Sequence, residues 1–159
     1  KIKEALNIIM TKTEEDVIRF IDNFKEEFFS MPPEDIAFPR SVNGLTKWSD
    51  PVTLYKKSCP IHVRGALLYN FQLKKRKLTH KYPLIQEGEK IKFCYLQKPN
   101  TVGENVISFI SNFPTEINIH KNVDYKLQFE KSFLYPLKII LDAIGWKTEK
   151  EVNLEFLFT

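Results

Sequence analysis

The chain has little of the chemistry that metal sites and secretion require. Its 159 residues include two cysteines, Cys59 and Cys94, and three histidines, His62, His80 and His120. None of them lies at the close spacing of a zinc motif. No apolar run is long enough to span a bilayer, and no segment resembles the hydrophobic part of a signal peptide. The sequence therefore predicts a soluble protein of a reducing compartment, with no metal site and no membrane partner.

Motifs for independent catalysis are also absent from the sequence. There is no GxSxG turn, no glycine-rich phosphate loop and no HExxH helix. Asp35, Asp50, Asp124 and Asp142 are isolated in the sequence, so none belongs to the close carboxylate pair that two-metal phosphoryl transfer needs. We therefore expect no catalytic residue and no cofactor in this chain.

Positive charge is concentrated in the middle of the chain. The formal net charge is only +4, but Thr53–Lys98 contains eleven Lys or Arg against Glu87 and Glu89, which gives +9. The flanks hold the other 13 basic and 18 acidic residues, which gives −5. Such a basic block is typical of a surface that binds nucleic acid, and an ordinary solvated surface is the alternative.

An apolar stripe predicts a helix near the N-terminus. Thr13 is a good helix cap, and the acidic residues after it favour the positive end of the helix dipole. Pro32 ends any helix that begins there. Four apolar residues lie between these signals at helical spacing: Val17, Ile21, Phe24 and Phe28. We expect a helix from Thr13 to about Phe29, with an acidic outer face.

Two more helices follow from the apolar pattern. One is expected over Asp124–Ile144, with a kink at Pro136 and an end at Gly145. Its apolar face includes Tyr125, Phe129, Phe133 and Leu137, which recur every four residues. Another helix is expected over Arg64–Leu73. There the pair Gly65-Ala66 allows a close approach, either of the core or of a ligand.

Alternating side chains predict a small β hairpin. Lys90–Leu96 alternates apolar and polar residues, Val106–Ile110 is a second short strand, and turn residues lie between them. Pro32–Pro60 is expected to be a long loop. With 43% hydrophobic residues the chain can bury a core. We therefore predict an α+β fold with one domain over residues 1–146 and a tail over residues 147–159.

Three collinear segments carry a resemblance to a known family. They are CPIHVRGALLYN (Cys59–Asn70), EGEKIKF (Glu87–Phe93) and DYKLQFEKSFLYPL (Asp124–Leu137). All three resemble the C-terminal thumb of the replicative family B DNA polymerases of T-even-like bacteriophages. The resemblance implies a mainly helical thumb with a small antiparallel β hairpin. It also implies that the catalytic motifs of DxxSLYPS and YGDTDS type, their Mg²⁺ and the 3′–5′ exonuclease lie in a polymerase body outside this sequence, in the same or a separate chain.

In that family the thumb holds the new duplex through its phosphate backbone and minor groove. The resemblance therefore implies that the partners are primer–template duplex and the polymerase body, in the cytoplasm of the infected host. Tyr135 stands where the family pattern has a basic residue. The residues expected to bind DNA match the motif or belong to the basic block: Lys56, Lys57, His62, Arg64, Tyr69, Asn70, Lys74, Lys75, Arg76, Lys77 and Lys131.

A purely structural or solvent-exposed role is the alternative for several of these residues. Tyr69 can be a core residue, His62 a hydrogen-bonded structural histidine, and Lys74–Lys77 a solvated turn. Arg64 lies between apolar neighbours, and a half-buried guanidinium needs an anionic partner such as phosphate or carboxylate.

The end of the chain is an apolar cluster. By resemblance it is a tail that binds the sliding clamp through Leu154, Phe156, Leu157 and Phe158, and the alternative is a segment folded onto its own core. Because Lys1 is not Met and Lys1–Met10 looks like helix interior, we expect a fragment, a processed product or a piece cut from a longer polypeptide. With the resemblance, the chain is either a domain cut from a full polymerase or the smaller partner of a polymerase encoded in two pieces.

Two other functions stay open at this point. One is a replisome adaptor that works through the tail and the acidic helix. The other is an autonomous RNA-binding module, in which aromatic residues of the basic block stack on bases.

Overall fold

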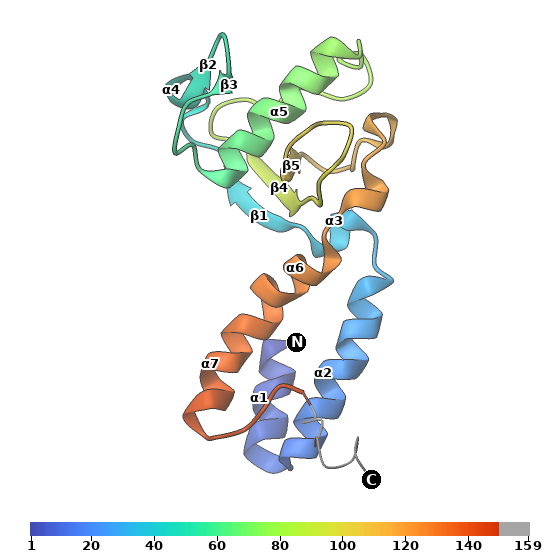
Figure 1. Ribbon diagram of the computed structural model, residues 1–159, viewed down its shortest axis with the longest axis vertical. Coiled ribbons are helices and arrows are strands. Elements are labelled where there is room, and N and C mark those ends of the chain that lie inside the picture. Colours follow the sequence, from blue (N-terminus) through green and yellow to red (C-terminus); the bar gives the residue numbers. More distant parts are fainter. Residues whose placement is uncertain (150–159) are drawn as a thin grey trace, which may run out of the picture. The chain divides into compact units, whose positions relative to one another are not determined.

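The computed structural model describes residues 1–149 and has an α+β fold, as predicted (Figure 1). The chain packs into two compact units. The helical unit consists of Lys1–Ser30 and the described residues from Phe129 onward, and the sheet unit is Met31–Gln128. Sequence patterns did not indicate these two units, because periodicity within single helices does not report which helices pack together. The predicted bounds of residues 1–146 and 147–159 stay a prediction.

The helical unit is built from α1 (Ile2–Thr11), α2 (Glu14–Phe29), the π-helical segment η3 (Glu130–Leu134) and α7 (Tyr135–Ala143). The predicted apolar stripe of α2 is buried. In this core the Phe24 ring lies 4.8 Å from the Phe133 ring, and the Phe28 ring lies 5.3 Å from the Phe129 ring.

The predicted Thr13 cap at the start of α2 is confirmed, and it is part of a capping box. The Thr13 hydroxyl accepts the Asp16 N–H at 3.3 Å, and the Asp16 carboxylate accepts the Thr13 N–H at 3.2 Å. Two amide groups that the helix itself leaves unpaired are thereby satisfied.

The helix predicted over residues 124–144 is present but divided. Its three parts are α6 (Tyr125–Phe129), η3 and α7. Pro136 has no N–H for the carbonyl four residues earlier, and its ring crowds that carbonyl. The disturbance predicted at Pro136 therefore takes the form of a π-helical turn just before it. Gly145, at a φ of 75°, ends α7 as predicted.

The sheet unit contains a three-stranded antiparallel sheet with the order β1-β4-β5. The predicted hairpin is confirmed: β4 (Lys90–Tyr95) pairs with β5 (Val106–Phe109), with Tyr95 opposite Val106. The third strand, β1 (Phe38–Ser41), was not predicted. It carries Pro39, which a sheet tolerates here because β1 is an edge strand.

The prediction of a loop over Pro32–Pro60 is wrong. Besides β1, this stretch forms short elements: α3 (Pro33–Ile36), α4 (Leu45–Trp48), and the hairpin of β2 (Ser49–Asp50) and β3 (Leu54–Tyr55). Elements of two to four residues are too short for hydrophobic periodicity to reveal.

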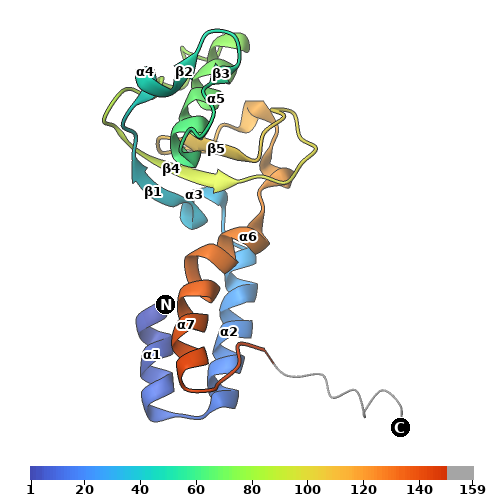
Figure 2. The same ribbon diagram turned by 60° about the vertical axis from the view of Figure 1, so that its left-hand side comes forward.

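Helix α5 (Ile61–Lys75) packs against β5, as Figure 2 shows, and is longer than the predicted 64–73. The contact is close at Gly65, where an added Cβ would lie 2.9 Å from the backbone nitrogen of Ser108. The Ser108 hydroxyl donates to the His62 carbonyl at 2.9 Å. Of the two roles that the sequence left open for Gly65, the structure supports close approach of the core.

Candidate nucleic-acid interface

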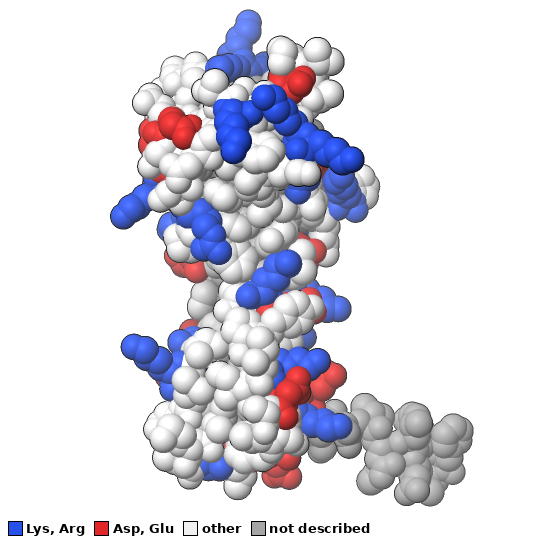
Figure 3. All heavy atoms as spheres, turned by 90° about the vertical axis from the view of Figure 1, so that its left-hand side faces the viewer, with Lys and Arg blue, Asp and Glu red and all other residues white. Residues whose placement is uncertain are grey.

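The two units differ in charge. The sheet unit has 15 Lys or Arg against 8 Asp or Glu, which gives +7, and the remaining 9 basic and 12 acidic residues of the sequence give −3. Figure 3 faces the side of the molecule that carries α4, β2 and β3, and Lys and Arg side chains gather there over the sheet unit. The basic block of the sequence is therefore a surface feature of this unit.

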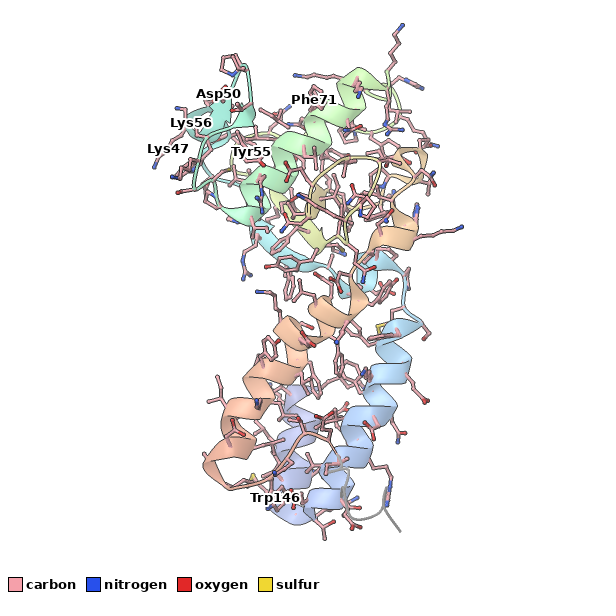
Figure 4. All side chains as sticks on the ribbon, in the orientation of Figure 1. Lys47, Asp50, Tyr55, Lys56, Phe71 and Trp146 are labelled. Carbon is pink, nitrogen blue, oxygen red and sulfur yellow. The ribbon has the colours of Figure 1, made fainter. Side chains whose placement is uncertain are left out.

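The hairpin of β2 and β3 supplies part of this basic surface. Lys56 and Lys57 follow β3 and are exposed, and Lys47 comes from α4 with its amine 5.2 Å from the Trp48 ring. Figure 4 shows Lys47 and Lys56 at the same end of the sheet unit. Asp50 is the last residue of β2, and the N–H groups of Thr53 and Val52 in the turn that follows donate to its carboxylate and lower its pKa. The Asp50 carboxylate is thus already hydrogen-bonded within its own hairpin.

The C-terminal end of α5 supplies more cations. Lys74, Lys75 and Lys77 are exposed, and within residues 1–149 none of them forms an ion pair. Their charges are favourable near the negative end of the helix dipole. Lys74 also lines a groove of about 330 Å³ between α5 and the β2–β3 hairpin. The solvated-turn alternative for these lysines and a phosphate contact are both compatible with this exposure.

Arg76 and Lys81 differ from these lysines because protein groups engage them. Arg76 donates to the Gln72 side chain at 3.0 Å and to the Glu116 carbonyl at 3.2 Å. Lys81 forms an ion pair with the Glu116 carboxylate. Hydrogen bonds from Lys81 and then Tyr82 lower the pKa of Glu116 to about 2. Arg76 therefore links the end of α5 to the segment around Glu116. The charge of Lys81 is already balanced by the Glu116 carboxylate.

Arg64 lies in a cluster drawn from three separate segments. Its Nη2 donates to Asn105 Oδ1 at 2.9 Å, and its guanidinium lies 5.6 Å from the centroid of the Tyr55 ring. The Tyr55 hydroxyl donates to Glu104 Oε1 at 2.7 Å, which raises the pKa of Tyr55. The sequence pointed to Arg64 but not to Glu104 or Asn105, because no spacing pattern connects residues 55, 64 and 104.

Tyr69 and Asn70 hold the segment that leads into β4. Tyr69 is 1% exposed and its hydroxyl donates to the Pro83 carbonyl at 3.3 Å, while burial raises its pKa to about 12. The Asn70 amide donates to the Ile85 carbonyl at 2.9 Å and accepts the Ile85 N–H at 2.8 Å. The polar groups of both side chains are thus already used within the protein and are poor candidates for DNA contacts. For Tyr69 the structure supports the alternative of a core residue.

We expect the change Asn70→Ala to lower the free energy of unfolding by about 2 kcal/mol, because it leaves the amide and carbonyl of Ile85 without their partner. Urea unfolding measures this change. Hydrogen exchange should show faster exchange of the Ile85 amide. The control Asn112→Ala, at an exposed residue, should change stability by less than about 0.5 kcal/mol. Equal effects of the two substitutions would contradict the structural role of Asn70.

The remaining predicted residues are placed as follows. His62 is half-buried at the start of α5, and its desolvation, followed by the charge of Arg40, lowers its pKa. Lys131 is exposed in η3 of the helical unit, so its place beside Arg64 in one DNA-binding surface stays a prediction. Tyr135 donates to Glu130 at 3.0 Å. The predicted clamp-binding residues, Leu154, Phe156, Leu157 and Phe158, lie outside the described residues.

Two further properties of residues 1–149 bear on possible ligands. Their His, Cys, Asp and Glu side chains include no group of three that could hold a metal ion. No helix in this part of the chain combines the length and the apolar character needed to cross a bilayer.

Comparisons with known proteins agree with the resemblance noted in the sequence. No protein-family model matches the chain. The chain is 28% identical over 161 residues to the DNA-directed DNA polymerase of Enterobacteria phage T4, an alignment that covers 99% of this chain and 17% of that protein. It is 31% identical over 127 residues to the DNA-directed DNA polymerase of Escherichia phage RB69, covering 77% of this chain and 14% of that protein. The chain therefore spans less than a fifth of either relative, and nearly all of it is similar to a region of the DNA-directed DNA polymerases of T-even-type phages.

Proposed function

We propose that this chain is the thumb part of a DNA-directed DNA polymerase and holds primer–template duplex during replication. The observation that carries the proposal is the basic surface of the sheet unit, formed by Lys47, Lys56 and Lys57 near the β2–β3 hairpin and by Lys74, Lys75 and Lys77 at the end of α5. The similarity to two phage DNA polymerases supports DNA as the polyanion.

The type of side chain on this surface favours binding to phosphates over base reading. Lysine amines are flexible point charges, and phosphate contacts carry no sequence information. A polymerase must hold every DNA sequence equally well, so contacts that do not depend on sequence suit it. We therefore propose contacts with the sugar–phosphate backbone and minor groove, to which Lys131 of the helical unit adds in the bound state.

The chemistry of nucleotide addition belongs, in this proposal, to a polymerase body that binds Mg²⁺ and contains the exonuclease. The body is either the rest of the same polypeptide or a separate chain, in the cytoplasm of the infected bacterium. A sliding clamp is a further proposed partner, through Leu154, Phe156, Leu157 and Phe158.

The RNA-binding hypothesis receives less support from the aromatic residues of the basic block. Tyr69 is buried, the hydroxyl groups of Tyr55 and Tyr82 are bonded to Glu104 and Glu116, and Phe71 is 45% exposed. Binding of single strands by stacking uses successive open aromatic rings. Of these four aromatic residues, Phe71 alone is classed as exposed.

The decisive measurement is the affinity of the chain for duplex DNA as a function of salt, alone and together with a polymerase body. We expect the logarithm of the binding constant to fall linearly with the logarithm of salt concentration, with similar values for unrelated sequences. Single-stranded RNA of the same length should compete poorly. The absence of salt-dependent duplex binding in both settings would refute the proposal.

A further inference from the structure

The cluster around Arg64 brings a cation and an acid to the same tyrosine. Tyr55 lies in β3, Arg64 in the first turns of α5, and Glu104 and Asn105 just before β5. The guanidinium lies against the Tyr55 ring and donates to Asn105, and the Tyr55 hydroxyl donates to Glu104. Both the Arg64 and the Glu104 charges act on the pKa of Tyr55, in opposite directions.

The protein does not fully satisfy Arg64. Its Nε is buried and has no hydrogen-bond partner among residues 1–149, and no carboxylate in that part of the chain lies within ion-pair distance of its guanidinium. A half-buried guanidinium whose protein partners, Asn105 and Tyr55, are both uncharged keeps most of its charge available for a stronger partner at its outer nitrogens. A phosphate is such a partner, because its oxygens match the guanidinium fork.

Glu104 is held beside the cluster by two contacts. Its carboxylate accepts the Tyr55 hydroxyl, and its backbone carbonyl accepts a hydrogen bond from the Asn100 side chain at 2.8 Å. The carboxylate is thus fixed on the hydroxyl of the same tyrosine whose ring the guanidinium faces, and within residues 1–149 it forms no ion pair with Arg64. Its negative charge opposes the approach of a phosphate to Arg64.

We infer that Tyr55 and Asn105 position Arg64 for a phosphate and that Glu104 limits the strength of this contact. This inference rests on the proposed duplex binding and adds a restraint to it. A restrained contact suits a surface along which the duplex must advance after each nucleotide, because every phosphate contact must break and form again.

The first test compares two substitutions that remove the same charge. Glu104→Gln keeps an acceptor for Tyr55, and Glu89→Gln is the matched control in the same unit, where Glu89 is also half-buried. We expect Glu104→Gln to tighten duplex binding by about threefold more than Glu89→Gln does, the size of a charge effect that solvent partly screens. In an Arg64→Gln background this extra gain should disappear.

A second pair of substitutions keeps Arg64 and is expected to weaken duplex binding instead of tightening it. Asn105→Asp puts a carboxylate directly on the guanidinium, and Asn112→Asp adds the same charge elsewhere on the sheet unit. We expect Asn105→Asp to weaken duplex binding by about tenfold more than its control and to lower the salt slope by about one phosphate contact. Circular dichroism and thermal melting show whether each variant is folded.

Each result separates this inference from the proposed function. Wild-type protein that binds duplex with normal salt dependence, while Glu104→Gln and Glu89→Gln behave alike, overturns the role of Glu104 and leaves duplex binding intact. A gain from Glu104→Gln that persists without Arg64 also overturns it. Wild-type protein without duplex affinity refutes the proposed function itself.

Discussion

The substitution Gly65→Ala is expected to lower the free energy of unfolding by about 3 kcal/mol. The new methyl group would lie 2.9 Å from the backbone nitrogen of Ser108 and would also meet the Ser108 hydroxyl. Gly65 is buried in α5, so α5 and β5 would have to separate to make room. Forcing one methyl group into a close-packed contact costs about 1–3 kcal/mol, and the upper end applies because a backbone atom cannot rotate away.

Thermal or urea unfolding measures this loss, and two further variants test its cause. Gly103→Ala adds a methyl group where no atom lies within 4 Å, so its cost of about 1 kcal/mol comes only from its φ of +72°. Combining Gly65→Ala with Ser108→Ala removes the hydroxyl but leaves the backbone nitrogen, so stability should return only in part. A full return would show that the backbone contact is unimportant.

The second large effect is expected from the lysines at the end of α5. Replacing Lys74, Lys75 and Lys77 together by glutamine should weaken duplex binding by about a hundredfold at 0.1 M salt and lower the salt slope by about three. Each of these lysines is exposed and has no ion pair within residues 1–149, so the loss should leave the fold unchanged. Arg76 is left in place because it binds Gln72 and Glu116.

A control of equal charge distinguishes this surface from general attraction. Lys3, Lys12 and Lys25 are exposed residues of the helical unit, and their joint replacement by glutamine changes the net charge by the same amount. It should change duplex affinity only slightly. Fluorescence anisotropy with labelled duplexes of unrelated sequence measures both variants. Equal losses in the two variants would mean that net charge governs binding, and dependence of the loss on base sequence would contradict a phosphate contact.

Long periodic elements were predictable because one helix face or one strand pair is a local property. The stripe of α2, its Thr13 cap, the end of the C-terminal helix at Gly145 and the hairpin of β4 and β5 all follow from residues close in sequence. Edge strand β1 did not follow, because it pairs with β4, some fifty residues away. The β2–β3 hairpin is local, but its strands of two residues are too short to show a periodic pattern.

For the candidate site, the sequence located the basic block but could not sort its members. In sequence, Arg76 and Lys77 are equivalent neighbours in a run of four cations. In the folded chain both are exposed, but Arg76 donates hydrogen bonds to Gln72 and Glu116, whereas Lys77 forms no ion pair within residues 1–149. Asn70 matched the motif as well as Arg64 did, yet its amide is used by Ile85.

The sequence by itself determined the α+β class, the main helices, the concentration of positive charge and the similarity to phage DNA polymerases, because each is a property of residue order. Tertiary structure alone decided the division into two units, the close approach at Gly65 and the meeting of Tyr55, Arg64, Glu104 and Asn105. These depend on contacts between residues as far apart in sequence as Phe24 and Phe133, and such contacts arise only when the whole chain has packed.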